Sequence, residues 1–148
     1  MQMELDEIIY NAITANETLM SLTGRRIKST TFEVPPTDED NTPIPYIVIY
    51  EDQSQNDQGT KDNVWESNRD TVNVGVEIAA TSPADVKRIR KLIRKSVMDY
   101  VLSNETDITQ LLSLTYDGIQ WFWEKPCYYD TLHYSCEMQI DLNDEDDE

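Results

Sequence analysis

Hydrophobic residues near the start of the chain recur at spacings of three and four. They are Leu5, Ile8, Ile9, Ala12 and Ile13. This spacing predicts an amphipathic helix ending near Thr14, with acidic residues in its first turn, where the helix dipole favours them. Asn16 and Gly24 then fit the N-cap and the C-cap of a short second helical segment.

The next part of the chain carries β-strand patterns. Residues Arg25–Phe32 predict a strand with Ile27 facing inward, and Tyr46–Tyr50 is an apolar run expected to be covered on both faces or to lie at an interface. Thr71–Ala80 alternates cleanly between apolar and polar positions. Between these strands, residues 51–63 hold no apolar side chain, which predicts a solvent-exposed loop or an extended hairpin arm.

A long helix follows the alternating strand. Ser82 fits an N-cap, Pro83 the first helical position and Asp85 the acidic third position. The helix is predicted to run to about Leu102.

Two strands are predicted in the last third of the chain. Ser113–Trp123 places Tyr116 and Ile119 on opposite faces, and Leu132–Leu142 alternates with its apolar residues inward. Residues 124–130 are expected to form the turn between them. Short links between strands, with one helix separating two strand pairs, predict an α+β fold: a mainly antiparallel sheet of about four to five strands with two main helices on one face.

Composition favours one acidic domain. At 148 residues the chain has the usual size of a single domain, and we expect residues 1–142 to form it and the acidic residues 143–148 to be a disordered tail. The net charge of −17 disfavours binding to nucleic acids and anionic membranes, and no apolar segment is long enough to span a bilayer. Increased solubility is the simplest consequence of this charge.

Residues for catalysis or cofactor binding are scarce. The single histidine, His133, lies on the outward face of a predicted strand without triad partners, and the four glycines form no phosphate-binding loop. Cys127 and Cys136 are too few for a zinc site and are expected to be reduced thiols. The sequence therefore predicts a non-enzymatic protein with no metal or cofactor.

The long helix carries half of the chain's basic residues. These are Lys87, Arg88, Arg90, Lys91, Arg94 and Lys95. At 100° per residue they form one cationic face opposite an apolar one. This face is either an ordinary solvated surface or a contact for an acidic partner, most simply another copy of the chain.

The order of parts resembles the phage tail completion, or tail terminator, proteins of long-tailed bacteriophages. The matching segments are LDEIIYNAITANETLMSLTGRRI, then P-x-P-Y-I-V-I-Y at 43–50, then VNVGVEIAATSPAD with the long helix after it. The resemblance covers about residues 4–103. It implies a structural virion protein, assembled in the host cytoplasm, that forms a ring, typically a hexamer, between the tail tube protein and a neck or head-connector protein.

The resemblance also implies functions for the charged segments of the chain. DNA would pass through an acidic lumen without specific binding, and the basic helix face would be a subunit interface. The polar segment would supply a lumen or partner loop with the charged residues Glu51, Asp52, Asp57, Lys61 and Asp62. The alternatives are a head-closure or neck adaptor ring protein and, from another class, an acidic DNA-mimic inhibitor.

Overall fold

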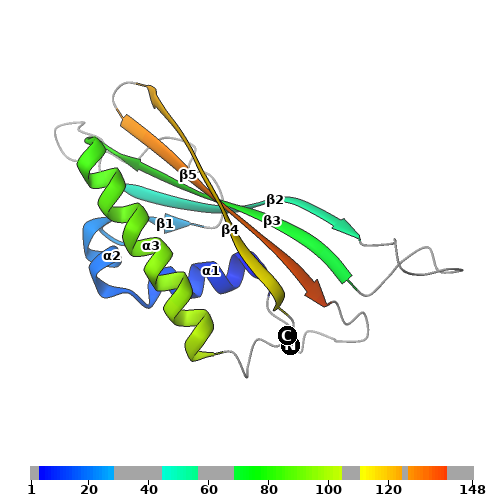
Figure 1. The fold of residues 1–148 in the computed structure, drawn as a ribbon. Coiled ribbons are helices and arrows are strands. Elements are labelled where there is room, and N and C mark those ends of the chain that lie inside the picture. The colour runs from blue at the N-terminus through cyan, green and yellow to red at the C-terminus, as the bar shows by residue number, and fades with distance from the viewer. Residues whose placement is uncertain (1–3, 29–44, 57–68, 105–110, 125–126, 140–148) are drawn as a thin grey trace, which may run out of the picture.

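A computed structural model describes residues 4–28, 45–56, 69–104, 111–124 and 127–139 of the chain. In this part of the chain, one five-stranded sheet carries helices on one face (Figure 1). The helices are α1 (Leu5–Thr14), α2 (Glu17–Leu22) and α3 (Pro83–Ser103). The strands are β1 (Ile27–Lys28), β2 (Tyr46–Asn56), β3 (Arg69–Ala80), β4 (Leu111–Glu124) and β5 (Cys127–Gln139). The predicted α+β fold is confirmed.

The strand order explains which parts of the sheet are exposed at its edges. The order is β1-β2-β3-β5-β4, with β1 parallel to β2 and all other pairs antiparallel. The last strand, β5, therefore lies between β3 and β4. As a result, β4 forms one edge of the sheet, on the side opposite to β1.

The helices form a layer that is joined to the sheet by apolar side chains. The apolar stripe of α1 is fully buried against β2, β3 and α3, whereas α3 packs on β3 and β5. The N-cap residue of α2, Asn16, accepts a hydrogen bond from the backbone N–H of Leu19 and donates one of 2.6 Å to Ser96 of α3. This contact fixes the short helix against the long one.

Both faces of the central strands bury apolar residues. Ile47, Ile49 and the alternating residues of β3 belong to the main core under the helices. Tyr46 and Val48 form a second cluster with Ala79 on the opposite face. The prediction that the Tyr46–Tyr50 strand is covered on both faces is thus confirmed for its first four residues, which are all buried.

Two predicted loops are partly strand. β2 continues through Asn56, which pairs with Asp70 of β3, so residues 51–56 belong to an extended hairpin arm. Similarly, β5 begins at Cys127, within the predicted turn 124–130. Ladder hydrogen bonds join backbone groups and do not need apolar side chains, so polar residues can extend both strands. Of the predicted first strand, Arg25 and Arg26 are not strand, and residues 29–32 lie outside the described residues, as does the predicted tail at 143–148.

One predicted strand register is wrong. The pairing of β4 with β5 shifts between Tyr116 and Gly118, which leaves Asp117 as an extra residue in a bulge. Gly118 has a φ of 118°, a conformation that favours glycine. Because of the bulge, Tyr116 and Ile119 both face the helix layer instead of lying on opposite faces.

Candidate functional site

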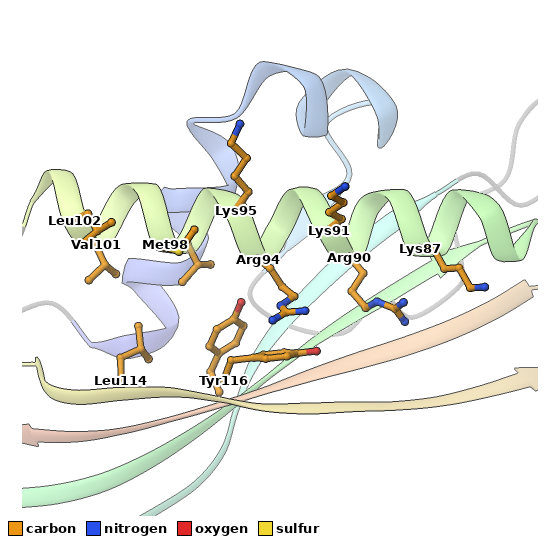
Figure 2. A pocket seen from close by; sticks show the side chains of 12 residues that line it. Lys87, Arg90, Lys91, Arg94, Lys95, Met98, Val101, Leu102, Leu114 and Tyr116 are labelled. Carbon is orange, nitrogen blue, oxygen red and sulfur yellow. The ribbon is translucent and has the colours of Figure 1, made fainter.

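A groove of about 970 Å³ lies between α3 and the edge strand β4 (Figure 2). Basic side chains of α3 line one end of it, and apolar side chains of α3 and β4 line the other. The basic residues are Lys87, Arg90, Lys91, Arg94 and Lys95. The apolar residues include Met98, Val101, Leu102 and Leu114.

The helical periodicity of α3 determines the direction in which each of its basic side chains points. Val86, Ile89, Ile93 and Val97 are buried against the sheet. Residues one position further along the chain, at 90 and 94, therefore lie at the flank of the buried stripe, above the edge of the sheet. In Figure 2 both arginines point toward the strands, whereas Lys91 and Lys95 rise from the opposite rim of the helix.

Arg90 has a partner within the chain. Its Nη1 donates a 2.6 Å hydrogen bond to Oδ2 of Asp130 on β5, and the Asp130 side chain is 7% exposed. A carboxylate this buried needs a compensating charge. Arg90 therefore stabilises the α3–β5 contact, and its charge is not available as an independent surface charge.

Arg94 also contacts the sheet. Its guanidinium carbon lies 4.1 Å from the ring centroid of Tyr116, a cation–π geometry. The ring of Tyr116 is in turn 5.4 Å from that of the buried Tyr134. Burial raises the pKa of Tyr134 well above its usual range, and the proximity of Tyr116 adds to this while Arg94 opposes it. Arg94 thus covers a small aromatic cluster on the floor of the groove.

The structure divides the six predicted interface residues into two groups. Lys87, Arg88, Lys91 and Lys95 are exposed, as expected for a surface that contacts solvent or a partner. Arg90 and Arg94 contact side chains of the sheet, and of these two Arg94 is also exposed whereas Arg90 is half-buried. Arg88 does not line the groove.

Sequence reasoning missed the apolar half of the groove. Met98 and Leu102 are 57% and 63% exposed, although they are large hydrophobic residues one helical turn apart. Leu114 of β4 points toward them across the groove (Figure 2). Their spacing of four is the signal that predicts a second apolar stripe on α3, beside the buried one.

An acidic patch lies over a different part of the sheet, where α1 begins beside the β2–β3 arm. Burial raises the pKa of Glu51, and the nearby carboxylates of Glu4, Asp6 and Asp70 raise it further. These four residues therefore form a cluster of like charges. Of the predicted lumen or partner loop, Glu51 and Asp52 are exposed residues of β2, and Asp57, Lys61 and Asp62 lie outside the described residues.

Within the described ranges, no group of three or more His, Cys, Asp or Glu is arranged to hold a metal ion. His133 is half-buried opposite Gly75 of β3, and Cys136 on the other face of β5 is buried in the core. No helix in the described part of the chain is long and apolar enough to span a membrane.

Comparison with solved structures gives matches in fold, and one of them extends over nearly the full length of both chains. One of 27 matching chains of solved structures belongs to the virion of a native gene transfer agent (GTA) particle, with a TM-score of 0.54 over 91% of this chain and 94% of that one. The two chains share a fold. Their sequences are 11% identical, so the likeness is one of architecture. No protein-family model and no curated protein matches the sequence.

Proposed function

We propose that this chain is a structural virion protein of a phage-like particle, a ring subunit that ends the tail tube and joins it to the head. The observation that carries the proposal is the likeness in fold to a chain of a virion, which extends over 91% of this chain. The order of helices and strands in the sequence supports the same class of protein. The ring most consistent with this class is a hexamer located at the tail or neck.

The distribution of charge supports head-to-tail contacts between copies. The basic residues of α3 lie beside β4, at one edge of the sheet, and the acidic patch at Glu51 lies on β2, toward the other edge. In a cyclic ring each subunit contacts its neighbour through two different surfaces. Opposite charges on these two surfaces would attract and orient neighbouring copies.

The net charge supports passage of DNA. At −17 per subunit, a closed ring would present many negative charges to DNA in its central opening. Like charges repel, so DNA phosphates would slide past without being retained. DNA would therefore pass through the ring without being bound by it.

Native mass spectrometry of the full chain at low and moderate salt tests the proposal. We expect a closed ring that weakens as salt increases, because salt screens contacts between exposed charges. A strict monomer at high protein concentration, alone and with a tail tube protein, would contradict it.

A pair of variants tests the basic face separately. Lys91→Glu with Lys95→Glu should dissociate the ring, whereas Lys91→Arg with Lys95→Arg keeps both charges and should leave it intact. A ring that survives the charge reversal would show that α3 is not the subunit interface.

Pull-down with a purified tail tube protein and with a purified head-connector protein distinguishes a ring at the tail from a ring at the head. Binding to a tail tube protein supports the tail terminator role. Binding only to a head-connector protein supports a head-closure or neck adaptor ring instead.

A further inference from the structure

The groove between α3 and β4 has an apolar end and a basic end, which follow one another along α3. Its apolar end is formed by Met98, Leu102 and Leu114, and its basic rim by Lys91 and Lys95, one to three helical turns closer to the start of α3. The lysines make no ion pair with another residue in the described part of the chain. An occupant must therefore offer apolar side chains followed by acidic ones.

We propose that the groove binds residues 140–148 of the same chain. This segment begins with Ile140 and Leu142, two residues apart, and continues with five acidic residues from Asp144 to Glu148. In an extended segment, residues two apart project on the same side, so both aliphatic side chains can face the apolar end together. The acidic residues then follow in the direction of the lysines.

The place where β5 ends brings the segment to the correct end of the groove. Met138 pairs with Leu111, and Cys136 pairs with Leu114. Gln139, the last residue of β5, is therefore three residues beyond the partner of Leu114, a distance of about 10 Å along the strands. The segment starts beside the apolar end of the groove, not beside the basic one.

The length of the segment matches the distance to the lysines. Along α3, Lys95 is about 10 Å and Lys91 about 17 Å from Leu102, at 1.5 Å per residue. The path from Gln139 to the level of Leu114 adds about 10 Å, so the whole path from Gln139 to Lys91 is about 27 Å. Nine extended residues span about 30 Å. The segment can therefore reach both lysines.

The acidic segment 51–63 fits the groove less well than residues 140–148. Residues 51–63 contain no apolar side chain, so they cannot cover Met98 and Leu102. Covering exposed aliphatic surface contributes about 25 cal/mol per Å² of apolar area, and of these two segments only residues 140–148 can supply this gain. The apolar end of the groove thus selects between two acidic segments that its lysines would accept equally.

Carbodiimide crosslinking of the full chain tests the inference, because it joins a lysine to a carboxylate only when the two are in contact. Equal amounts of ¹⁴N-labelled and ¹⁵N-labelled chain are mixed before the reaction and analysed by mass spectrometry. We expect links from Lys91 and Lys95 to the acidic residues 144–148, with both linked peptides carrying the same isotope. Lys28, an exposed lysine of β1, is the internal comparison and should not link to them.

A substitution in the segment tests the apolar contact. Ile140→Ser with Leu142→Ser leaves every carboxylate in place and should reduce the yield of these links about tenfold, as expected for two uncovered aliphatic side chains. The ¹³C-methyl NMR signal of Met98 should shift in the same variant, because its neighbour is lost. Arg88→Glu reverses a charge on α3 outside the groove and should change neither result.

Three results would overturn the inference: links that join ¹⁴N to ¹⁵N chains, links to Lys28 as frequent as those to Lys91, and a yield unchanged by the two serines. The first of these would identify the groove as a site for a neighbouring copy's segment. The inference does not depend on the proposed ring, because it concerns a single chain. Crosslinks within a strictly monomeric chain would support it even if ring formation failed.

Discussion

Arg90 and Asp130, forty positions apart in the sequence, meet through a 2.6 Å hydrogen bond where α3 crosses β5. The contact lies next to the groove and holds one wall of it against the sheet. A charge reversal at Arg90 would leave the buried carboxylate without its partner. Such a variant would report on folding, so the interface is better tested at the exposed lysines.

The first prediction concerns this pair. Asp130→Ala should lower the free energy of unfolding by about 2 kcal/mol, because it removes a hydrogen bond between charged groups and leaves the Arg90 guanidinium unpaired. Urea denaturation measures the change. Asp99→Ala is the control: Asp99 is an exposed residue of α3, the helix that carries Arg90, and its loss should have little effect on the free energy of unfolding. Equal stabilities of the two variants would mean that the pair contributes nothing.

The second prediction concerns the face of the sheet opposite the helices. Tyr50 of β2 lies directly over Gly75 of β3, and a methyl group at position 75 would overlap the Tyr50 ring. Gly75→Ala should therefore destabilise the chain by about 1–3 kcal/mol. Replacing Tyr50 with serine in addition should recover part of that loss. If the two changes are additive in thermal unfolding, the glycine is not required by the tyrosine ring.

The third prediction concerns alkaline pH. Burial raises the pKa of Tyr134, so the folded chain retains a proton that the unfolded chain loses above about pH 10. The associated stability is present below that pH and decreases as the pH rises. Tyr134→Phe should therefore give a free energy of unfolding that falls less steeply between pH 10 and pH 11. Some slope should remain, because the pKa of Tyr50 is raised as well. Identical slopes would place Tyr134 in contact with solvent.

The fourth prediction concerns the acidic patch. Since the folded state raises the pKa of Glu51, its ionised form opposes folding at neutral pH, and this cost decreases as the pH falls through the folded pKa and is absent below the unfolded pKa. Glu51→Gln should raise the stability of the monomer at pH 7 by a few tenths of a kcal/mol, a small effect because the side chain is exposed. The difference should shrink near pH 5 and at high salt. Differential scanning calorimetry on the monomer checks the sign.

The same substitution separates stability from assembly. If the acidic patch contacts the lysines of a neighbouring copy, Glu51→Gln should weaken the proposed ring while it stabilises the monomer. A parallel loss of both properties would indicate a folding defect instead.

A fifth prediction joins the two proposals. If residues 140–148 cover the lysines that a neighbouring copy needs, the two contacts compete. Replacing the five acidic residues 144–148 with their amides should then increase the fraction of rings at low protein concentration, as measured by mass photometry. A decrease would mean that the segment supports assembly.

The main elements of this fold could be predicted from local patterns. The capping residues at Ser82 and Asp85 predict the start of α3, and alternation predicts β3 and β5 on the correct faces. These signals work because helix periodicity and strand alternation depend on neighbouring residues only. They also identified the basic face of α3, including the exposed Lys91 and Lys95.

The remaining features depend on partners distant in the sequence. No local pattern predicts that Arg90 faces Asp130, since the pairing follows from the placement of β5 beside β3. The bulge at Asp117 shifts Ile119 by one position relative to strict alternation, and only Gly118 in the strand hinted at it. The polar arm at 51–56 lacked a strand signal because its pairing uses backbone groups alone.

The position of β5 between β3 and β4 also restricts how the chain can fold. β3 cannot be paired along its second edge until the last strand has been synthesised, because the helix α3 and the strand β4 precede that strand. The local β4–β5 hairpin can form early, whereas closing β5 onto β3 requires a long loop to be ordered first. Until then, β3 exposes an unpaired apolar strand that other chains could join. A nascent chain is therefore most prone to aggregation just before β5 is complete.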